Sequence, residues 1–407
     1  MGSAVQLRAI KRRRLRKRLT FSLVFLGLTS AIGAKPGYDH LRAASLLTRV
    51  AQPENHTWVA DFQRHGVDVS LTQMETSVGP VRAKVYVPRE VPNPPALVII
   101  HGIHHLGIDE PRLMAFANAF CSSGVLVFTP QVDSLADYTI EPSAVTIIGE
   151  SVQQLSQRTG APRVGLMGLS FAGGLALTAA SDPRYSPSIA YTVAVGAHHD
   201  LGRVLRFYAS DEIETTGRVM VRAKAHEYGL LVAAYSHIAD FFQPEDQANA
   251  REALRQLLYE NLEESKAAAS KLSPDGIETM NLLYAQSKAS VGPVILDRLP
   301  LYESDLALVS PRGKLGTITA PVYLLHGAGD NVIPPSETEW IASEVPPRYL
   351  AQSLVSSAIS HVEVGGQPTF EDKARLLHWL AEFVSEANNA PASTKTLSPA
   401  IPSTQAQ

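Results

Sequence analysis

Residues 163–174, with the sequence RVGLMGLSFAGG, decide which fold the chain is expected to adopt. The apolar run at 163–167 predicts a buried strand, and the small residues at 172–180 predict a helix that stops before Pro183. Ser170 lies between them, with a glycine two residues before it and another three residues after it. A serine at such a strand–helix bend indicates a nucleophile elbow, a strained turn that lifts the hydroxyl clear of the sheet. The start of the helix would also offer free N–H groups to a developing negative charge.

The usual elbow pattern is Gly-x-Ser-x-Gly, and this chain has Ala172 at the fifth position. Alanine is small enough for a close crossing of strand and helix, although it tolerates unusual backbone angles less well than glycine. The alternative is a glycine-rich turn in which Ser170 is incidental. The residues that follow along the chain favour the elbow.

A serine nucleophile needs a base, normally a histidine that a carboxylate orients, and candidates for both lie downstream. The strand-like run at 321–325 leads into the loop HGAGD, which ends at Asp330. His361 follows a further strand-like run at 350–356. Open α/β sheets bind ligands at the carboxyl ends of their strands, so both side chains are predicted at the same edge as Ser170.

An oxyanion hole needs two N–H donors aimed at the tetrahedral oxygen. The residue after the nucleophile, Phe171, is expected to supply one of them. The second is expected from Ile103, in the loop that follows the strand-like run at 96–100. Gly102 would let the backbone turn sharply there, and His101 is expected to brace the loop.

Between about residues 67 and 386 the chain resembles serine hydrolases of the α/β-hydrolase superfamily. The resemblance rests on four landmarks in order: His101-Gly102, Gly168-Leu169-Ser170-Phe171-Ala172, His326-Gly327-Ala328-Gly329-Asp330 and His361. It implies that Ser170 is the nucleophile, that His361 acts as general base and then acid, and that Asp330 orients His361. Together the landmarks are specific for the superfamily and not for a substrate, and no cofactor or metal is implied.

Other acidic residues and histidines compete for roles at this edge. Asp200 follows the strand-like run at 190–195 and is the rival to Asp330 as triad acid, while Asp133 is expected to form a turn. Two histidine groups could be interpreted as metal ligands, yet neither has the spacing of a zinc helix, and no H-E-x-x-H motif is present. These groups are His101, His104 and His105, and His198, His199 and Asp200.

The charges are unevenly distributed along the chain. The net charge is −3, but residues 1–18 hold eight of the 36 Lys and Arg and none of the 39 Asp and Glu. The remaining chain is therefore markedly acidic, which argues against nucleic acid as a partner.

The basic segment precedes an uncharged run of sixteen residues, 19–34. A helix of that length spans about 24 Å, somewhat less than a hydrocarbon core of about 30 Å. The pattern fits a cleaved signal peptide or an uncleaved signal anchor, hence a transmembrane segment. Either places the catalytic domain on the non-cytoplasmic side, anchored to the membrane or secreted into the periplasm or medium.

The alternation of strands and helices predicts an α/β fold, a mostly parallel sheet with helices on both faces and an inserted helical cap. The predicted organisation has a linker at 35–65 after the segment 1–34, a hydrolase core at 66–198 and 319–387, a helical cap at 199–318 and a disordered tail at 388–407. Within the cap, residues 220–242 are the first candidate helix, with Gly229 as a kink or packing site.

The sequence therefore predicts a serine hydrolase that cleaves a carboxylic ester, small or lipid-like, through an acyl-enzyme on Ser170. Two alternatives remain open: a non-catalytic, membrane-tethered binding protein on the same scaffold, and an acyltransferase that uses the same triad.

Overall fold

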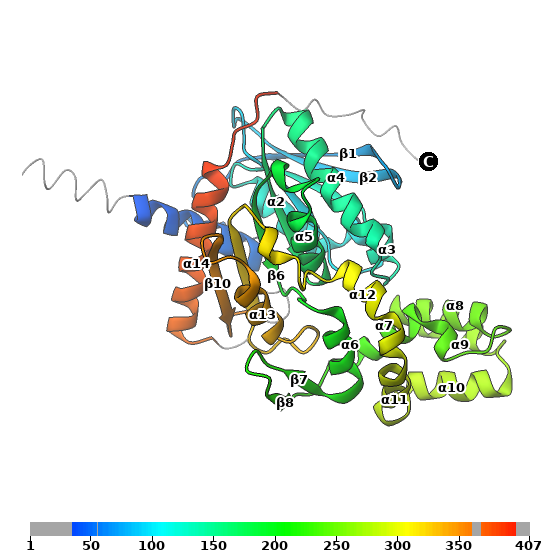
Figure 1. The fold of residues 1–407 in the computed structure, drawn as a ribbon. Coiled ribbons are helices and arrows are strands. Elements are labelled where there is room, and N and C mark those ends of the chain that lie inside the picture. The colour runs from blue at the N-terminus through cyan, green and yellow to red at the C-terminus, as the bar shows by residue number, and fades with distance from the viewer. Residues whose placement is uncertain (1–34, 55, 360–367, 396–407) are drawn as a thin grey trace, which may run out of the picture.

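The computed structural model describes residues 35–54, 56–359 and 368–395, and its central feature is an eight-stranded sheet (Figure 1). The strand order is β1-β2-β4-β3-β5-β6-β9-β10. The hairpin β1–β2 pairs antiparallel with β4, and all later neighbours are parallel. The strands are β1 Val67–Thr76, β2 Gly79–Pro88, β3 Ala96–Ile100, β4 Leu126–Pro130, β5 Val164–Leu169, β6 Ile189–Val195, β9 Val322–Gly327 and β10 Leu350–Ser356.

The central strands are buried on both faces, which explains why they are continuous apolar runs in the sequence. Every residue of β3, β4, β6 and β9 is buried, whereas nearly all residues of β1, at the sheet edge, are half-buried or exposed. This arrangement is the α/β-hydrolase fold that the sequence predicts.

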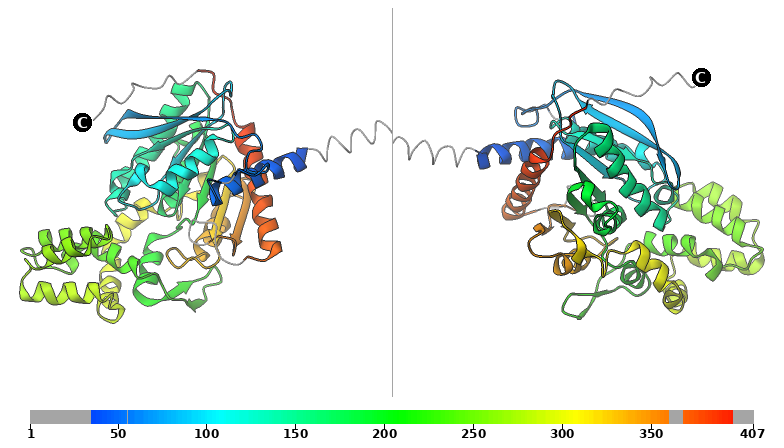
Figure 2. Two further views of the ribbon diagram at one scale, coloured as in Figure 1. Left: turned by 180° about the vertical axis from the view of Figure 1, so that it is seen from behind. Right: turned by 45° about the horizontal axis from the view of Figure 1, so that its top comes forward.

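Helices cover both faces of the sheet (Figure 2). One face carries α4 Pro142–Thr159, α5 Phe171–Ser181 and α13 Ser336–Glu344. The other carries α2 Pro111–Cys121, α14 Phe370–Asn389 and a helix at 35–51. Shorter helical turns are α3 Asp133–Ala136, η1 Gly107–Asp109, η2 Ser186–Ser188 and η5 Leu315–Thr317.

Local sequence signals set where these helices begin. Glu110 caps α2 by accepting a hydrogen bond from the Leu113 amide, directly before Pro111. Thr369 and Asp372 form a capping box at the start of α14.

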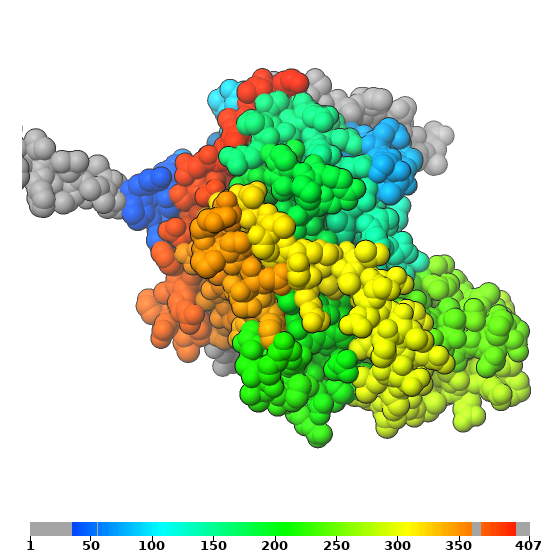
Figure 3. Space-filling view, viewed as in Figure 1, coloured from blue at the N-terminus to red at the C-terminus, as the bar shows by residue number. Residues whose placement is uncertain are grey.

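The region between β6 and β9 forms the cap, residues 199–318, which extends as a lobe beyond the sheet (Figure 3). It is mostly helical: α6 Leu201–Ser210, α7 Tyr228–Ser236, η3 Ile238–Asp240, α8 Gln247–Leu258, α9 Leu262–Ala269, α10 Pro274–Tyr284, α11 Lys288–Arg298, η4 Leu299–Tyr302 and α12 Glu303–Val309.

One detail of the cap differs from the prediction. A hairpin of β7 Glu212–Glu214 and β8 Met220–Arg222 precedes α7, so residues 220–242 are not one long helix. Gly229 lies in the first turn of α7, where a Cβ would stand 2.4 Å from the ring of Tyr208. Its role is close packing and not a kink.

The segment 35–65 is not a linker. Its helix packs into the core through Ala43, Leu46 and Arg49, each at most 4% exposed, because an apolar stripe on the helix matches the surface of α2 and α14. The Arg49 guanidinium donates hydrogen bonds to the carbonyl and hydroxyl of Ser122 at the end of α2. The helix at 35–51 is therefore part of the sheet domain.

The tail is also shorter than predicted, because residues 388–395 are bound to the domain. Residues 388 and 389 belong to α14, Ala392 bridges to Pro95, and the Thr394 amide donates to the Thr159 carbonyl. The rest of the predicted tail lies outside the described residues, as does the segment 1–34. Among the helices that are described, none is long and apolar enough to cross a membrane.

Candidate active site

Ser170 occupies a strained turn between β5 and α5. Its backbone angles are φ 57° and ψ −133°, a region that side-chain-bearing residues rarely adopt. A Cβ on Gly168 would stand 2.2 Å from the carbonyl oxygen of Ala172, so this position must be glycine. Ala172 lies within the helix and needs no unusual angles, which explains why alanine suffices there. The strand–turn–helix geometry is that of a nucleophile elbow.

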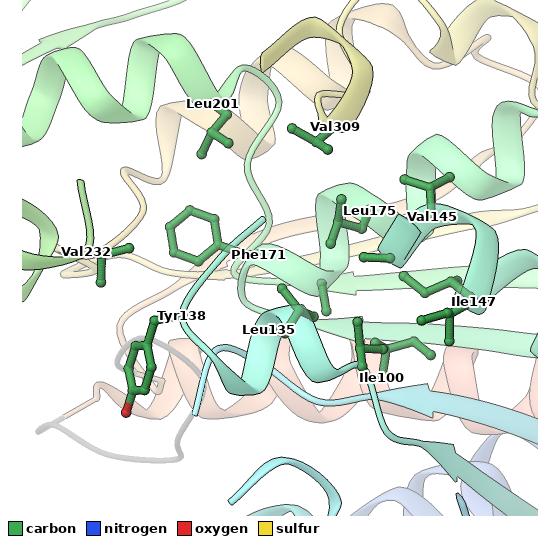
Figure 4. Close-up of a cluster of buried hydrophobic side chains, with 14 of the residues drawn as sticks. Ile100, Leu135, Tyr138, Val145, Ile147, Phe171, Leu175, Leu201, Val232 and Val309 are labelled. Carbon is green, nitrogen blue, oxygen red and sulfur yellow. The ribbon is translucent and has the colours of Figure 1, made fainter. Parts of the chain in front are cut away.

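The start of α5 directly follows Ser170. The first N–H groups of a helix have no acceptor within the helix, and Phe171 is the first residue of α5. The Phe171 side chain points away from the sheet, among Leu201, Val232 and Val309 of the cap (Figure 4). Phe171 directly follows Ser170 at the start of the helix, and its role as an oxyanion donor stays a prediction.

The loop after β3 approaches the serine from the other side. A Cβ built on Gly102 would lie 3.3 Å from the Ser170 Cβ, which leaves little room between the two backbones. The carbonyl of Gly102 lies 2.7 Å from the His101 Nδ1. The Gly102 carbonyl and the Ile103 N–H belong to one trans peptide, in which C=O and N–H point in opposite directions. The Ile103 N–H therefore points away from the His101 ring.

His101 braces this loop, as predicted, through both of its ring nitrogens. Nδ1–H donates to the Gly102 carbonyl, and Nε2 accepts a hydrogen bond of 3.0 Å from the Val132 amide. Complete burial lowers the pKa of His101 to about 4. The imidazole is therefore neutral at ordinary pH, with one nitrogen donating and the other accepting.

Asp330 lies in the loop after β9, at the same sheet edge as Ser170. The ends of β5, β6 and β9 are linked in turn: the Ser170 amide donates to Val195, and the Gly196 amide donates to Leu325. The Asp330 carboxylate is buried, and its Oδ1 accepts hydrogen bonds of 2.9 Å from the amides of Val332 and Ile333.

His326 supports the same loop. It is fully buried, with Nε2 2.9 Å from the Ile333 carbonyl oxygen and 3.3 Å from Oδ2 of Asp330. Its Nδ1 lies 2.7 Å from the Thr338 hydroxyl. The imidazole ties the Asp330 loop to β9 and α13, a role that its spacing in the sequence did not indicate.

Asp200, the rival acid, is engaged in the cap. Its Oδ1 accepts from the amides of Gly202 and Arg203, which caps α6, and its Oδ2 pairs with Arg312 at 2.7 Å. Burial opposes ionisation, but the hydrogen bond from Arg312 and the charges of Arg203 and Arg312 hold the pKa of Asp200 below its usual value. Asp133 begins the short helix α3 with an exposed side chain.

His361 lies outside the described residues, so the structure describes Ser170, Asp330, Phe171 and Ile103 but not the predicted base. The strand before it, β10, ends beside the Asp330 loop, since the Ala328 amide donates to the Ser356 carbonyl. His361 therefore remains a prediction.

The predicted histidine groups have structural partners. His104 stacks on His105 at 4.6 Å between ring centroids, and His105 stacks on Tyr259 of the cap at 4.7 Å. Burial and the neighbouring His105 lower the pKa of His104. His198 is fully buried, with Nε2 3.0 Å from the Val309 carbonyl oxygen. Within the described residues, no group of three or more His, Cys, Asp or Glu side chains is arranged to hold a metal ion.

An apolar cavity of about 230 Å³ opens beside Ser170, and we call it the Ser170 cavity. None of the described residues that line it belongs to the cap. Its apolar walls come from the helix at 35–51 (Leu46, Leu47 and Val50), α2 (Leu113, Phe116 and Phe120), α14 (Leu376, Trp379, Leu380 and Phe383), the strand ends (Met167, Leu169, Val195 and Leu325) and Ile359.

The sequence interpretation missed the contribution of the helix at 35–51 to this cavity. The signal was present as an apolar stripe at positions 43, 46, 47 and 50, spaced as one face of a helix. Nothing local in the sequence shows that this face meets α14, more than 300 residues away.

No family model and no curated protein sequence matches the chain. Among solved structures, an esterase of Pyrobaculum calidifontis is similar at 15% identity and a TM-score of 0.43, over 86% of this chain and 91% of the esterase. A 2,6-dihydroxy-pseudo-oxynicotine hydrolase is similar at 15% identity and a TM-score of 0.43, over 82% of this chain and 71% of the hydrolase. A puromycin-hydrolyzing peptidase of Mycobacterium tuberculosis is similar at 15% identity and a TM-score of 0.45, over 80% of this chain but only 39% of the peptidase. Similarity at this level says nothing about substrate.

Proposed function

We propose that the protein is a serine hydrolase that cleaves a carboxylic ester through an acyl-enzyme on Ser170. The observation that carries the proposal is the strained backbone of Ser170, at φ 57° between β5 and α5, with Gly102 packed against it. Strain of this kind persists where the surrounding structure enforces it, and it concentrates at functional sites.

In the proposed reaction, His361 takes the hydroxyl proton as Ser170 Oγ attacks the ester carbonyl. The amides of Phe171 and Ile103 stabilise the negative oxygen, and the alcohol leaves with the proton from His361. Water then attacks the acyl-enzyme with His361 again as base, releasing the acid and restoring Ser170. Asp330, held by the amides of Val332 and Ile333, orients His361.

The proposal is tested by a fluorophosphonate probe together with turnover of p-nitrophenyl acetate. Wild-type protein should be labelled and active, whereas Ser170→Ala should lose labelling and lose kcat by a factor on the order of 10⁶, as in other serine triads. Removing the hydroxyl adds no bulk, so thermal unfolding should be unchanged. Equal labelling of both proteins would contradict the assignment of Ser170.

The test also separates the two alternative functions. A binding protein on this scaffold would show neither labelling nor turnover. An acyltransferase would be labelled, but its acyl-enzyme would be released faster by an added alcohol than by water.

A further inference from the structure

Two hollows lie near Ser170, one on each side of the sheet. The Ser170 cavity is lined by Ser170 and Gly102 themselves and measures about 230 Å³. The second, of about 450 Å³, lies under the cap and reaches Phe171. Its described lining includes neither Ser170 nor Gly102, and it includes polar groups such as Ser236, His237 and Asp305. The first hollow is therefore the one continuous with the nucleophile.

The walls of the Ser170 cavity are suited to an apolar group. Side chains of the helix at 35–51, α2 and α14 face it, and Trp379 and Phe383 are at most 3% exposed. Its charged lining residues, Glu110 and Arg112, form an ion pair at 2.6 Å, and the Arg112 side chain is mostly exposed. The Glu110–Arg112 pair marks the end of the cavity that opens to solvent. Deeper inside, the hydrophobic effect favours burial of an apolar group.

The volume limits what the cavity can hold. A dry apolar cavity of about 150 Å³ holds benzene, and pockets for drug-sized ligands measure about 300–1,000 Å³. On this scale, 230 Å³ accommodates a single apolar group of about six to nine carbon atoms. It is too small for two long chains.

We propose that the Ser170 cavity binds the acyl chain of the substrate, and that the substrate is an ester of one medium-length acyl group of about six to nine carbons. This inference rests on the proposed function, since the acyl group is the part that stays bonded to Ser170 while the alcohol departs. A cavity that ends among buried side chains suits the part that stays. The helix at 35–51 thereby becomes a specificity-determining element of the site.

The test compares p-nitrophenyl acetate, hexanoate, octanoate and palmitate on the full chain. For wild type, kcat/KM should rise by about fourfold for each added methylene that is buried, and should fall for palmitate. Leu47→Trp and Val50→Trp fill the cavity from the helix at 35–51. Each should lower kcat/KM for octanoate at least tenfold and leave acetate within about twofold, since two excluded methylenes already account for more than tenfold.

Three further variants complete the design. Phe116→Ala enlarges the cavity and should shift the preferred ester toward longer chains, which keeps the test valid if a tryptophan variant fails to fold. Ala51→Trp places the same side chain at the exposed last residue of the same helix, and its chain-length profile should match wild type. Ser236→Trp fills the hollow under the cap instead and should also leave the profile unchanged.

Two results would overturn the inference. One is that Ser236→Trp shifts the preferred ester toward shorter acyl chains and Leu47→Trp does not, because the acyl chain would then lie under the cap. The other is a profile that no cavity variant changes while acetate is still turned over. Loss of acetate turnover and of Ser170-dependent labelling in the wild type would instead overturn the proposed function itself.

Discussion

The sheet domain and the cap hold their polar groups in different ways. Around Ser170 the sheet uses buried contacts: His101 and Asp330 are at most 6% exposed and are bound by backbone amides. The cap contacts the sheet domain through a buried ion pair of Arg203 with Glu337 and through a more exposed cluster of Asp137, Tyr235 and Arg255, in which the Arg255 and Asp137 side chains are 34% and 38% exposed.

The difference matters because water weakens exposed polar contacts far more than buried ones. The groups around Ser170 are fixed by the interior of the sheet domain, whereas each polar contact of the partly exposed Asp137 cluster contributes little. Apolar packing of Phe171 against Leu201 and Val232 also joins the two parts (Figure 4). We therefore expect changes in the sheet domain to affect chemistry strongly, and changes at the cap junction to affect mainly how the cap is attached.

The largest difference should appear between two carboxylates, one in each part. Asp330→Asn keeps the shape of the loop but removes the charge that orients His361, and kcat should fall about 10⁴-fold. Asp200→Asn, in the cap, should change kcat by less than tenfold, because its carboxylate caps α6 and pairs with Arg312. Turnover of p-nitrophenyl acetate by the two variants measures the contrast, and a larger loss for Asp200→Asn would make Asp200 the triad acid.

The next effect is a pH dependence of stability that His101 causes. Its pKa is about 4 in the folded protein, against an ordinary value of 6.5. Below pH 6.5 the His101 side chain binds a proton in the unfolded chain but not in the folded protein. The free energy of unfolding therefore falls as the pH drops toward 4, by about 3 kcal/mol from this group. Urea unfolding at pH 7, 6, 5 and 4 measures the free energy of unfolding.

His101→Gln should be less stable at pH 7, since the bond from the Val132 amide is weakened, but its stability should fall less steeply with acid. The exposed His56→Gln controls for the loss of an imidazole, and its profile should follow wild type. If the free energy of unfolding falls by the same amount between pH 7 and pH 4 in His101→Gln and in wild type, the pKa of His101 is not lowered in the folded protein.

The contrast between the two parts also explains how far the sequence could be interpreted. Strands β3 and β6 and helix α5 were predicted within one residue of their actual bounds, because buried parallel strands are unbroken apolar runs and the elbow has its own pattern. In the cap, the three-residue strands β7 and β8 are too short to show alternation, so a helix was predicted across β8.

Long-range contacts are the other limit. The apolar stripe of the helix at 35–51 is visible in the sequence, yet the docking of this helix against α14 depends on matching surfaces far apart in the chain, such as Arg42 donating to Asn388. The interaction of His326 with Asp330 and Thr338 likewise depends on how the loop after β9 folds back. Residue types and spacing indicated Ser170 and Asp330, but not the side chains that hold them in place.

The smallest predicted effect tests the cap junction. The Tyr235 hydroxyl donates to the Asp137 carboxylate at 2.9 Å and accepts from Arg255 at 3.0 Å. Tyr235→Phe should lower the free energy of unfolding by about 1 kcal/mol, because Arg255 still pairs with the partly exposed Asp137. Tyr284→Phe is the matched control, since it removes a hydrogen bond to Ser265 that lies wholly within the cap.

Limited proteolysis should cleave the cap faster in Tyr235→Phe than in Tyr284→Phe, while both keep acetate turnover within about threefold of wild type, about 0.7 kcal/mol. Equal cleavage of the two variants would mean that the Asp137 cluster does not hold the cap to the sheet domain.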